Sequence, residues 1–319
     1  MWHGSEAYEL RHDNPHMLRA HITHRLAAFL LLPLLEIIVV FPAASQTVPA
    51  HRAGLQNGQV ASLSAFNPQI ETLPPHFSGN NTEVIYGLVS RKLPNPTKSE
   101  FESIAEYRTR LEDFASRPLS ARAAKPEDLF AFALSGQPCV GAYSVEDKSA
   151  YRNITTHYDA EIHKLTVALA PDIFAARDDT WSALWRSTRV YVGEYVGSNA
   201  FGVKKRINRW SQSDTVIVIH DFAWLSSDCD LTDGAACQID LDAQKAPALA
   251  RNPQAILIGS LTPPFISDEV LAGMPTVDTP IDISKRRKYL HVKLEQLWLV
   301  DGMTGHVITK YSRGKHVTE

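Results

Sequence analysis

The stretch LHVKLEQLWLVDGMTGHVITKY, residues 290–311, carries the clearest structural pattern in the chain. Apolar side chains at positions 290, 292 and 294 alternate with polar ones, which is the period of a strand with one buried face. The run DGMTG at residues 301–305 then separates two strand patterns with residues that suit a tight connection. The sequence therefore predicts a β-hairpin close to its C-terminal end.

Further strand patterns precede this hairpin. Segments on either side of turn residues predict two more hairpins, residues 153–157 with 165–169 and residues 189–196 with 203–209. Short apolar runs predict covered strands at residues 215–219 and 255–261, and branched and aromatic residues predict a strand at residues 83–90.

Two segments predict helices. Thr97 and Glu100 have the spacing of a capping box, so we expect a helix over residues 97–116. Its core-facing stripe consists of Phe101, Ile104, Ala105, Leu111, Phe114 and Ala115. Residues 242–251 predict a shorter helix, which Asn252 and Pro253 end. Because the strands lack regular alternation with helices, the sequence predicts an α+β fold, β-rich with antiparallel hairpins and two or three helices.

The composition bounds the kind of protein. The 319 residues are 44% hydrophobic and 21% charged, as expected of a chain that folds. Lysine and arginine number 32 against 35 acidic residues, and the net charge of −3 excludes the basic field of a general nucleic-acid binder. Residues 46–82 have no sustained period and are interpreted as a flexible tether. Residues 83–319 form the globular region, with a further boundary near residues 117–127.

Residues 26–44, LAAFLLLPLLEIIVVFPAA, predict a secretory signal peptide. Arg19 and Arg25 precede this nearly continuous apolar run, and small residues follow it up to Ser45. We expect residues 1–45 to be removed, so that membrane contact through this segment is transient. An alternative start of the chain is Met17.

A periplasmic or secreted location follows from this interpretation. The alternative is a membrane anchor at residues 26–44, because these 19 residues are nearly as many as the about 20 that a helix needs to cross the bilayer core. Glu36 argues against the anchor, since an ionised carboxylate in hydrocarbon costs about 2.5 to 3.5 kcal/mol.

Export to an oxidising compartment would allow a disulfide to form among the three cysteines of the chain. Cys229 and Cys237 lie close together around the turn residues Asp233 and Gly234, and we predict a disulfide between them. Cys139 is then left over. The alternatives are a free pair of thiols or a metal site, although three cysteines without C-x-x-C spacing are poor zinc ligands.

Several polar residues are candidates for chemistry. His157, Asp159 and His163 could ligate a metal or share a proton, and His220 is a further candidate for a site assembled from distant segments. The alternative is that the first three are solvated residues of a hairpin. We expect no bound cofactor.

A group of aspartates around a glycine resembles an oxygen-rich cation loop: Asp228, Asp230, Asp233 and Asp240. Counting from Asp228, position 6 is Asp233 and position 12 is Ile239, where an EF-hand needs glycine and glutamate. We therefore favour a structural turn held by the cysteines over a bound calcium ion.

The basic and aromatic clusters could also bind ligands, but a structural interpretation of each is more common. Residues 204–206 and 285–288 could meet phosphate groups or an anionic membrane, but solvated strand ends are more common. Five tryptophans could line a ligand groove, although core packing is the usual role of this side chain in strands. They are Trp181, Trp185, Trp210, Trp224 and Trp298.

The segment KSEFESIAEYRTRLEDF contains Glu100-Phe101-Glu102, Glu106-Tyr107 and Arg110. This E-F-E-x-x-x-E-Y-x-x-R pattern resembles a helix of uncharacterised exported bacterial proteins, and the YVGSNAFG and LWLVDGMTG segments add to the likeness. The resemblance implies an envelope location and brings no activity or catalytic residue.

The sequence contains no H-E-x-x-H, G-x-S-x-G, P-loop or G-x-G-x-x-G motif. We therefore expect a non-enzymatic envelope domain that binds a protein partner or a small ligand, or takes part in an assembly. The alternative is a periplasmic hydrolase with a dispersed site, for which His157, Asp159 and His220 are the first residues to test.

Overall fold

The computed structural model describes residues 63–120, 124–135, 153–169, 180–231 and 235–313, and the backbone of residues 315–318. The predicted signal segment, the alternative anchor, Met17, Cys139 and Asp233 lie outside these residues. The described residues belong to one compact unit, residues 56–319, and the boundary expected near residues 117–127 falls within it.

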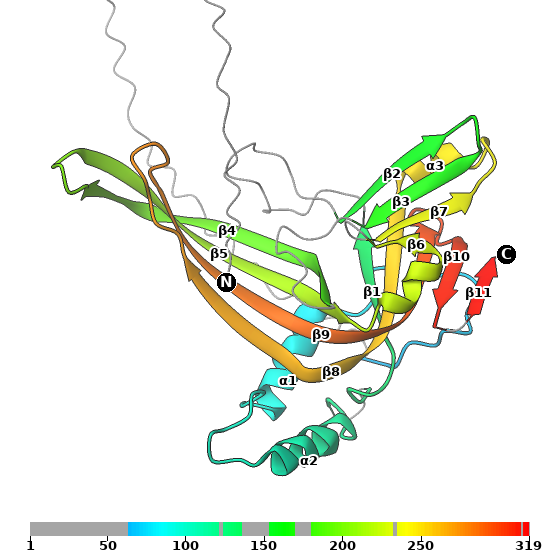
Figure 1. Ribbon diagram of the computed structural model, residues 1–319, viewed down its shortest axis with the longest axis horizontal. Helices are drawn as coiled ribbons and strands as arrows, with labels where there is room; N and C mark the ends of the chain where they lie inside the picture. The colour runs from blue at the N-terminus through cyan, green and yellow to red at the C-terminus, as the bar shows by residue number, and fades with distance from the viewer. Residues whose placement is uncertain are drawn as a thin grey trace, which may run out of the picture. The chain divides into compact units, whose positions relative to one another are not determined.

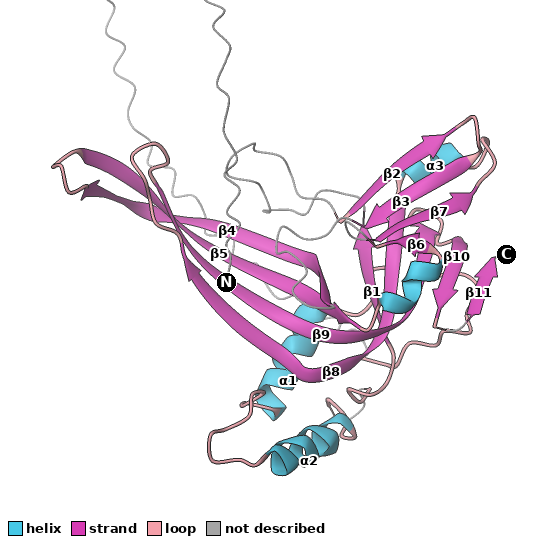
Figure 2. Cartoon of the chain, in the orientation of Figure 1, coloured by secondary structure: helices cyan, strands magenta, loops and turns pink. Residues whose placement is uncertain are grey.

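The described strands form two sheets, and three α-helices accompany them, which confirms the predicted α+β class (Figures 1 and 2). The large sheet consists of β1 (Phe130–Ser135), β4 (Thr180–Ser198), β5 (Lys204–His220), β8 (Pro253–Ala272), β9 (Ile281–Asp301), β10 (Val307–Ser312) and β11 (Lys315–Thr318). The small sheet consists of β2 (Ile154–Asp159), β3 (Lys164–Leu169), β6 (Cys229–Asp230) and β7 (Ala235–Asp240). The helices are α1 (Thr82–Lys92), α2 (Ile104–Ala115) and α3 (Ala246–Arg251), with a 3₁₀ turn η1 (Ala223–Ser227).

The predicted C-terminal hairpin is confirmed as β9 and β10, which pair antiparallel from Val307–Val300 to Ser312–Gln296. The turn between them closes through the Gly305 amide, which donates to the Asp301 carbonyl at 2.8 Å. Gly305 has a φ of +77°, and a Cβ at this position would lie 2.1 Å from the Leu73 carbonyl oxygen. Both the left-handed conformation and the close approach require glycine here.

Two long hairpins dominate the large sheet. β4 pairs with β5 from Thr180–His220 to Ser198–Lys204, and β8 pairs with β9 over nearly their full lengths. β5 and β9 pair in parallel, so the tips of both hairpins lie at the same end of the sheet (Figure 2).

These strands are longer than their sequence patterns. The pattern at 189–196 and 203–209 is the distal part of the β4–β5 hairpin, and the run at 215–219 continues β5. The strand expected at 255–261 runs on past Pro263 and Pro264 as β8, because the register shift between Leu261 and Ile266 takes the prolines out of the ladder.

The strand predicted at residues 83–90 is wrong, because this segment forms α1. Asn81 caps the helix by accepting hydrogen bonds from the backbone amides of Glu83 and Val84. Ile85 and Val89, four residues apart, are both fully buried in the main core. Their burial against the large sheet overrides the strand preference of the branched side chains.

The helix predicted over residues 97–116 begins later, at Ile104. The capping box forms between Ser103 and Glu106, not between Thr97 and Glu100. The predicted stripe is also wrong at its start, because Phe101 is 91% exposed and Ile104 67% exposed, while Leu111 and Phe114 are buried.

The motif residues before and within α2 hold the connection from α1. Glu102 pairs with Arg110 through contacts of 2.8 and 2.9 Å, and this hydrogen bonding lowers the pKa of Glu102. Arg110 also donates to the Asn95 carbonyl at 2.7 Å, and Tyr107 donates to the Pro96 carbonyl at 3.0 Å. This part of the motif therefore has a structural role.

Residues 63–81, expected as the end of the tether, pack against the large sheet. Phe66 contacts the buried Trp298 edge-to-face, with ring centroids 5.5 Å apart, and Leu73 is buried. Lys310 donates to the Ile70 carbonyl at 2.9 Å. These contacts cover the sheet face that carries Ile256 and Trp298, whereas the opposite face packs on α1, α2 and the small sheet.

The small sheet contains the predicted β2–β3 hairpin, which pairs from Ile154–Leu169 to Asp159–Lys164. The predicted disulfide is present between Cys229 of β6 and Cys237 of β7, directly opposite each other in register. It closes the short connection that follows η1.

Candidate functional site

The first group of sequence candidates does not form a site. His157 lies exposed on β2, and the described residues offer its ring no hydrogen bond. Asp159 accepts from the backbone amide of Glu161 at 2.9 Å and so stabilises the β2–β3 turn. The ring of exposed His163 contacts the Tyr158 hydroxyl at 3.3 Å. These residues belong to the solvated β2–β3 hairpin, and within the described residues no hydrogen bond or ion pair joins any two of the three.

The aspartates also stay separate. Asp228 accepts from the Ser227 hydroxyl at 2.8 Å beside η1, and Asp230 lies exposed on β6. Within the described ranges, no three histidine, cysteine or acidic side chains gather as a metal would require.

His220 belongs to a row of three polar side chains, and the sequence analysis did not identify the other two, His291 and Ser267. At the end of β5, Nε2 of His220 lies 2.9 Å from Nδ1 of His291 on β9. Nε2 of His291 lies 2.8 Å from the Ser267 hydroxyl on β8. Burial lowers the pKa of both imidazoles, that of His291 to about 4.

This serine–histidine pair is a poor match to a hydrolytic site. A general base works best with a pKa near the working pH, whereas His291 is a much weaker base than an ordinary imidazole. The group behind His291 is His220 where a catalytic triad has a carboxylate. The arrangement links three neighbouring strands and does not favour the hydrolase alternative.

A second polar chain crosses the four long strands further out. Asp214 of β5 is 1% exposed and accepts from the Ser187 hydroxyl of β4 at 2.6 Å. Gln212 Nε2 donates to the same carboxylate at 2.9 Å. Arg287 of β9 stands 3.9 Å from it, close enough for an ion pair but too far for a hydrogen bond.

The polar chain of side chains continues to β8 through Glu269. Arg287 contacts this carboxylate at 3.3 Å, and Tyr289 donates to it at 2.6 Å. The pKa of Tyr289 is raised to about 12, mainly by burial and to a lesser extent by this hydrogen bond. Arg287 is only 11% exposed, so the interpretation of residues 285–288 as solvated is wrong for Arg287. The polar chain ties β4, β5, β9 and β8 together in one register.

From Gln212 and Glu269 of this polar chain outward, the two hairpins continue to their tips as the distal arms, which we define as residues 189–212 and 269–286. Ten of the fifteen large apolar side chains that are exposed in the described residues belong to them. They are Val190, Tyr191, Val192, Tyr195, Val196, Phe201, Val203, Val270, Met274 and Val277. Phe201 and Met274, near the two tips, are 92% and 90% exposed. Such a concentration is typical of an interaction surface.

The distal arms also have open edges. Among the described strands β4 pairs with β5 alone, and β8 beyond Ile266 pairs with β9 alone. The outer backbone amides and carbonyls of a strand in this position are available to a further strand.

Three of the cavities lined by described residues bear on function. The largest of these three, about 1100 Å³, lies between β7, α3 and the β9–β10 hairpin and is lined by four charged residues among others, Asp240, Asp242, Lys245 and Asp301. The second, about 630 Å³, lies beside α2 and is lined in part by the charged residues Lys92, Glu102, Arg110, Asp113 and Arg117.

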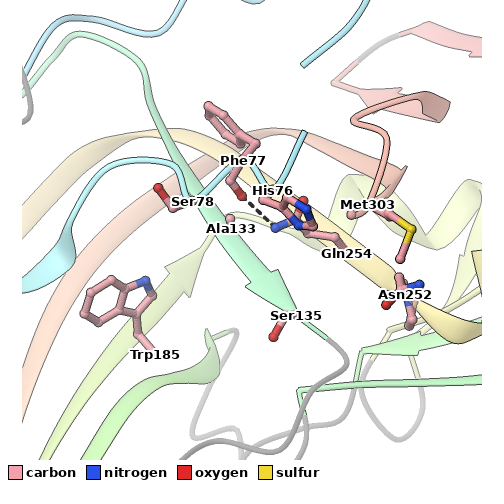
Figure 3. A pocket seen from close by; sticks show the side chains of 11 residues that line it. His76, Phe77, Ser78, Ala133, Ser135, Trp185, Asn252, Gln254 and Met303 are labelled. Carbon is pink, nitrogen blue, oxygen red and sulfur yellow. Dashed lines mark hydrogen bonds between the residues drawn. The ribbon is translucent and has the colours of Figure 1, made fainter. Parts of the chain in front are cut away.

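The third cavity, of about 370 Å³, we call the Trp185 cavity (Figure 3). Its lining is His76, Phe77, Ser78, Ala133, Ser135, Trp185, Asn252, Pro253, Gln254, Gly302 and Met303. Of the other candidate tryptophans, Trp181 and Trp298 are buried in the core, as expected, and Trp224 packs against it. Trp210 lies in the distal arms and contacts Tyr191 edge-to-face.

Comparison with protein-family models, with curated proteins and with solved structures finds no match for the chain. Within the described residues, none of the helices is long and apolar enough to span a bilayer.

Proposed function

We propose that this chain is an exported envelope protein whose α+β domain binds a protein partner through the distal arms. The observation that carries the proposal is the gathering of exposed apolar side chains on strands whose outer edges no other described strand pairs with. A four-stranded ribbon of this length would normally be protected by charges, prolines or a covering element. β4 carries only Arg186, Arg189 and Glu194 as charged residues along its 19 positions.

The partner that fits these edges best is a second copy of the chain. The ribbon has one open edge on β4 and another on the distal part of β8, at opposite sides of the same sheet. An edge of one copy can therefore pair with the other edge of the next, which is a head-to-tail contact. Apolar side chains flank both edges, Val190 and Val196 on β4 and Val270 on β8.

Export to an oxidising compartment is part of the proposal. The disulfide between Cys229 and Cys237 supports it, because such bonds persist mainly outside the cytosol. The apolar run at residues 26–44, with its small residues up to Ser45, also supports export, because it has the pattern of a secretory signal peptide.

Assembly is tested by light scattering and chemical cross-linking of the processed protein over a range of concentrations. We expect the native chain to self-associate and the V190K/V196K variant to do so at least about tenfold more weakly, because each buried valine contributes about 1.5 kcal/mol or more. Ile162→Lys is the matched control, since Ile162 is 58% exposed in the β2–β3 turn, away from the distal arms. A native chain that stays monomeric, or a variant that associates as the control does, would refute this role.

Export is tested separately by cell fractionation and by the mass of the mature N-terminus. A chain that begins at Gln46 in the periplasmic fraction or the medium is the expected result. A chain that retains Met1 and stays in the cytosol contradicts it, whatever the assembly experiment shows.

A further inference from the structure

The Trp185 cavity is built where four separate segments meet β4. Residues 76–78 lie beside the ends of β1 and β8, and Gly302 and Met303 come from the β9–β10 turn. The His76 amide donates to the Gly302 carbonyl at 3.1 Å, and the Gly302 amide donates to the Asn252 carbonyl at 2.9 Å. Backbone hydrogen bonds between the segments therefore hold the walls in place.

Unused hydrogen-bonding groups are concentrated in this cavity. The side chains of His76, Ser78, Ser135 and Asn252 line it and form no hydrogen bond with any other described residue. Gln254 is held by its Nε2, which donates to the Phe77 carbonyl at 2.7 Å, and its Oε1 has no partner in the described structure. His76, Ser78 and Ser135 are exposed and Asn252 is half-buried, so these groups are accessible to a ligand or to water, whereas Gln254 Oε1 is a buried acceptor.

The described lining residues carry no fixed charge. None of the eleven is aspartate, glutamate, lysine or arginine, whereas each of the other two cavities has several. A charged ligand would find no opposite charge among these residues, which favours a neutral ligand.

The arrangement of polar and apolar groups in the cavity indicates which class of neutral ligand fits. Figure 3 shows the Trp185 ring on one side of the cavity and Asn252 and Met303 on the other. The indole offers a flat apolar face, and among the described residues its N–H has no partner. A sugar ring matches this pattern, because it has an apolar C–H face and an edge of hydroxyl groups that donate and accept hydrogen bonds.

A lipid chain matches this pattern less well, and a peptide serves as a comparison ligand in the test. A hydrocarbon chain would leave the serine and amide groups without partners. At about 370 Å³ the cavity lies at the lower end of the range for ligand sites, about 300–1000 Å³, and suits a small molecule.

We propose that the Trp185 cavity binds a small neutral saccharide. The sugar ring stacks on the indole of Trp185, and its hydroxyl groups bond to Asn252, Ser135 and Ser78. This site is independent of the distal arms and of the assembly that they mediate.

The test is a calorimetric titration of the processed protein with maltose, cellobiose and N,N′-diacetylchitobiose, each up to about 10 mM, a range that detects dissociation constants in the millimolar range. We expect at least one disaccharide to bind. Trp185→Ala should weaken binding at least about tenfold and Asn252→Ala about threefold or more, whereas Trp185→Phe should retain most of the affinity. Trp210→Ala is the matched control, because this tryptophan lies in the distal arms, and it should bind like the native chain.

A second variant tests the site without removing Trp185, so the test remains valid if Trp185→Ala does not fold. Met303 is 54% exposed in the β9–β10 turn, so Met303→Trp should leave the core intact, fill the cavity and abolish binding. Glucose 6-phosphate and an uncharged blocked dipeptide serve as comparison ligands. The proposal is overturned if no disaccharide binds, if binding is unchanged in Trp185→Ala, Asn252→Ala and Met303→Trp, or if either comparison ligand binds more tightly than the sugars.

Discussion

Replacing Asp214 with alanine tests whether the polar chain across the four long strands holds them together. The carboxylate is buried, and it accepts hydrogen bonds from Ser187 at 2.6 Å and from Gln212 at 2.9 Å. In the D214A variant both donors lose their acceptor, and Arg287 keeps only Glu269 as its counter-charge among the contacts described above.

The expected loss follows from these contacts. A hydrogen bond to a charged group contributes about 1.5–3 kcal/mol, so two of them amount to about 3–6 kcal/mol. Relief from burying the carboxylate offsets part of this sum, whereas the ion pair at 3.9 Å adds little. We therefore expect D214A to lower the free energy of unfolding by about 3 kcal/mol.

Urea titration of the oxidised protein, followed by tryptophan fluorescence, measures this free energy. The control is D282A, because Asp282 forms a partly exposed pair with Arg209 at 3.8 Å that contributes less than about 1 kcal/mol. The double variant S187A/D214A should cost less than the sum of its single variants, since the two residues share one hydrogen bond. If D214A unfolds at the same urea concentration as D282A, the polar chain does not stabilise the ribbon.

Three further predictions concern the disulfide, the capping box and the buried histidine. Replacing both Cys229 and Cys237 with alanine should lower stability by about 2.5 kcal/mol through the entropy of the closed loop, with residues 8 apart in sequence, and added reductant should then have no further effect on the thermal midpoint. Ser103→Ala should cost about 1 kcal/mol in a urea titration, because the N-cap of α2 loses its bond to the Glu106 amide. Burial lowers the pKa of His291 from 6.5 to about 4, so the unfolded chain binds more protons than the folded one between these values. Stability is then fully present above pH 6.5 and falls by up to about 3 kcal/mol toward pH 4, and urea midpoints for His291→Asn should vary less over this range than those of the native chain.

Local signals in the sequence were sufficient for elements whose partners are close along the chain. The alternation at 290–294 and the turn at 301–305 predicted the β9–β10 hairpin, and the same reasoning found the β2–β3 hairpin. The spacing of Cys229 and Cys237 around the turn-forming residue types at 233 and 234 predicted the disulfide, and the structure places the two cysteines opposite each other on β6 and β7.

The same signals failed where distant contacts decide the structure. The branched residues of 83–90 suit a strand, but burial of Ile85 and Val89 makes them a helix. Phe101 belongs to the predicted stripe, yet the helix starts after it, because Ser103 has an extended backbone and caps α2 by accepting from the Glu106 amide.

The candidate sites show this division most clearly. Sequence alone determined the α+β class, three hairpins and the disulfide, since these depend on side-chain period, turn residues and short loops. Only the tertiary structure decided that His220 meets His291, 71 residues away, or that Asp214 lies near Arg287. Parallel pairing of β5 with β9 creates both contacts, and it arises from the packing of the whole sheet, which no local stretch of sequence encodes.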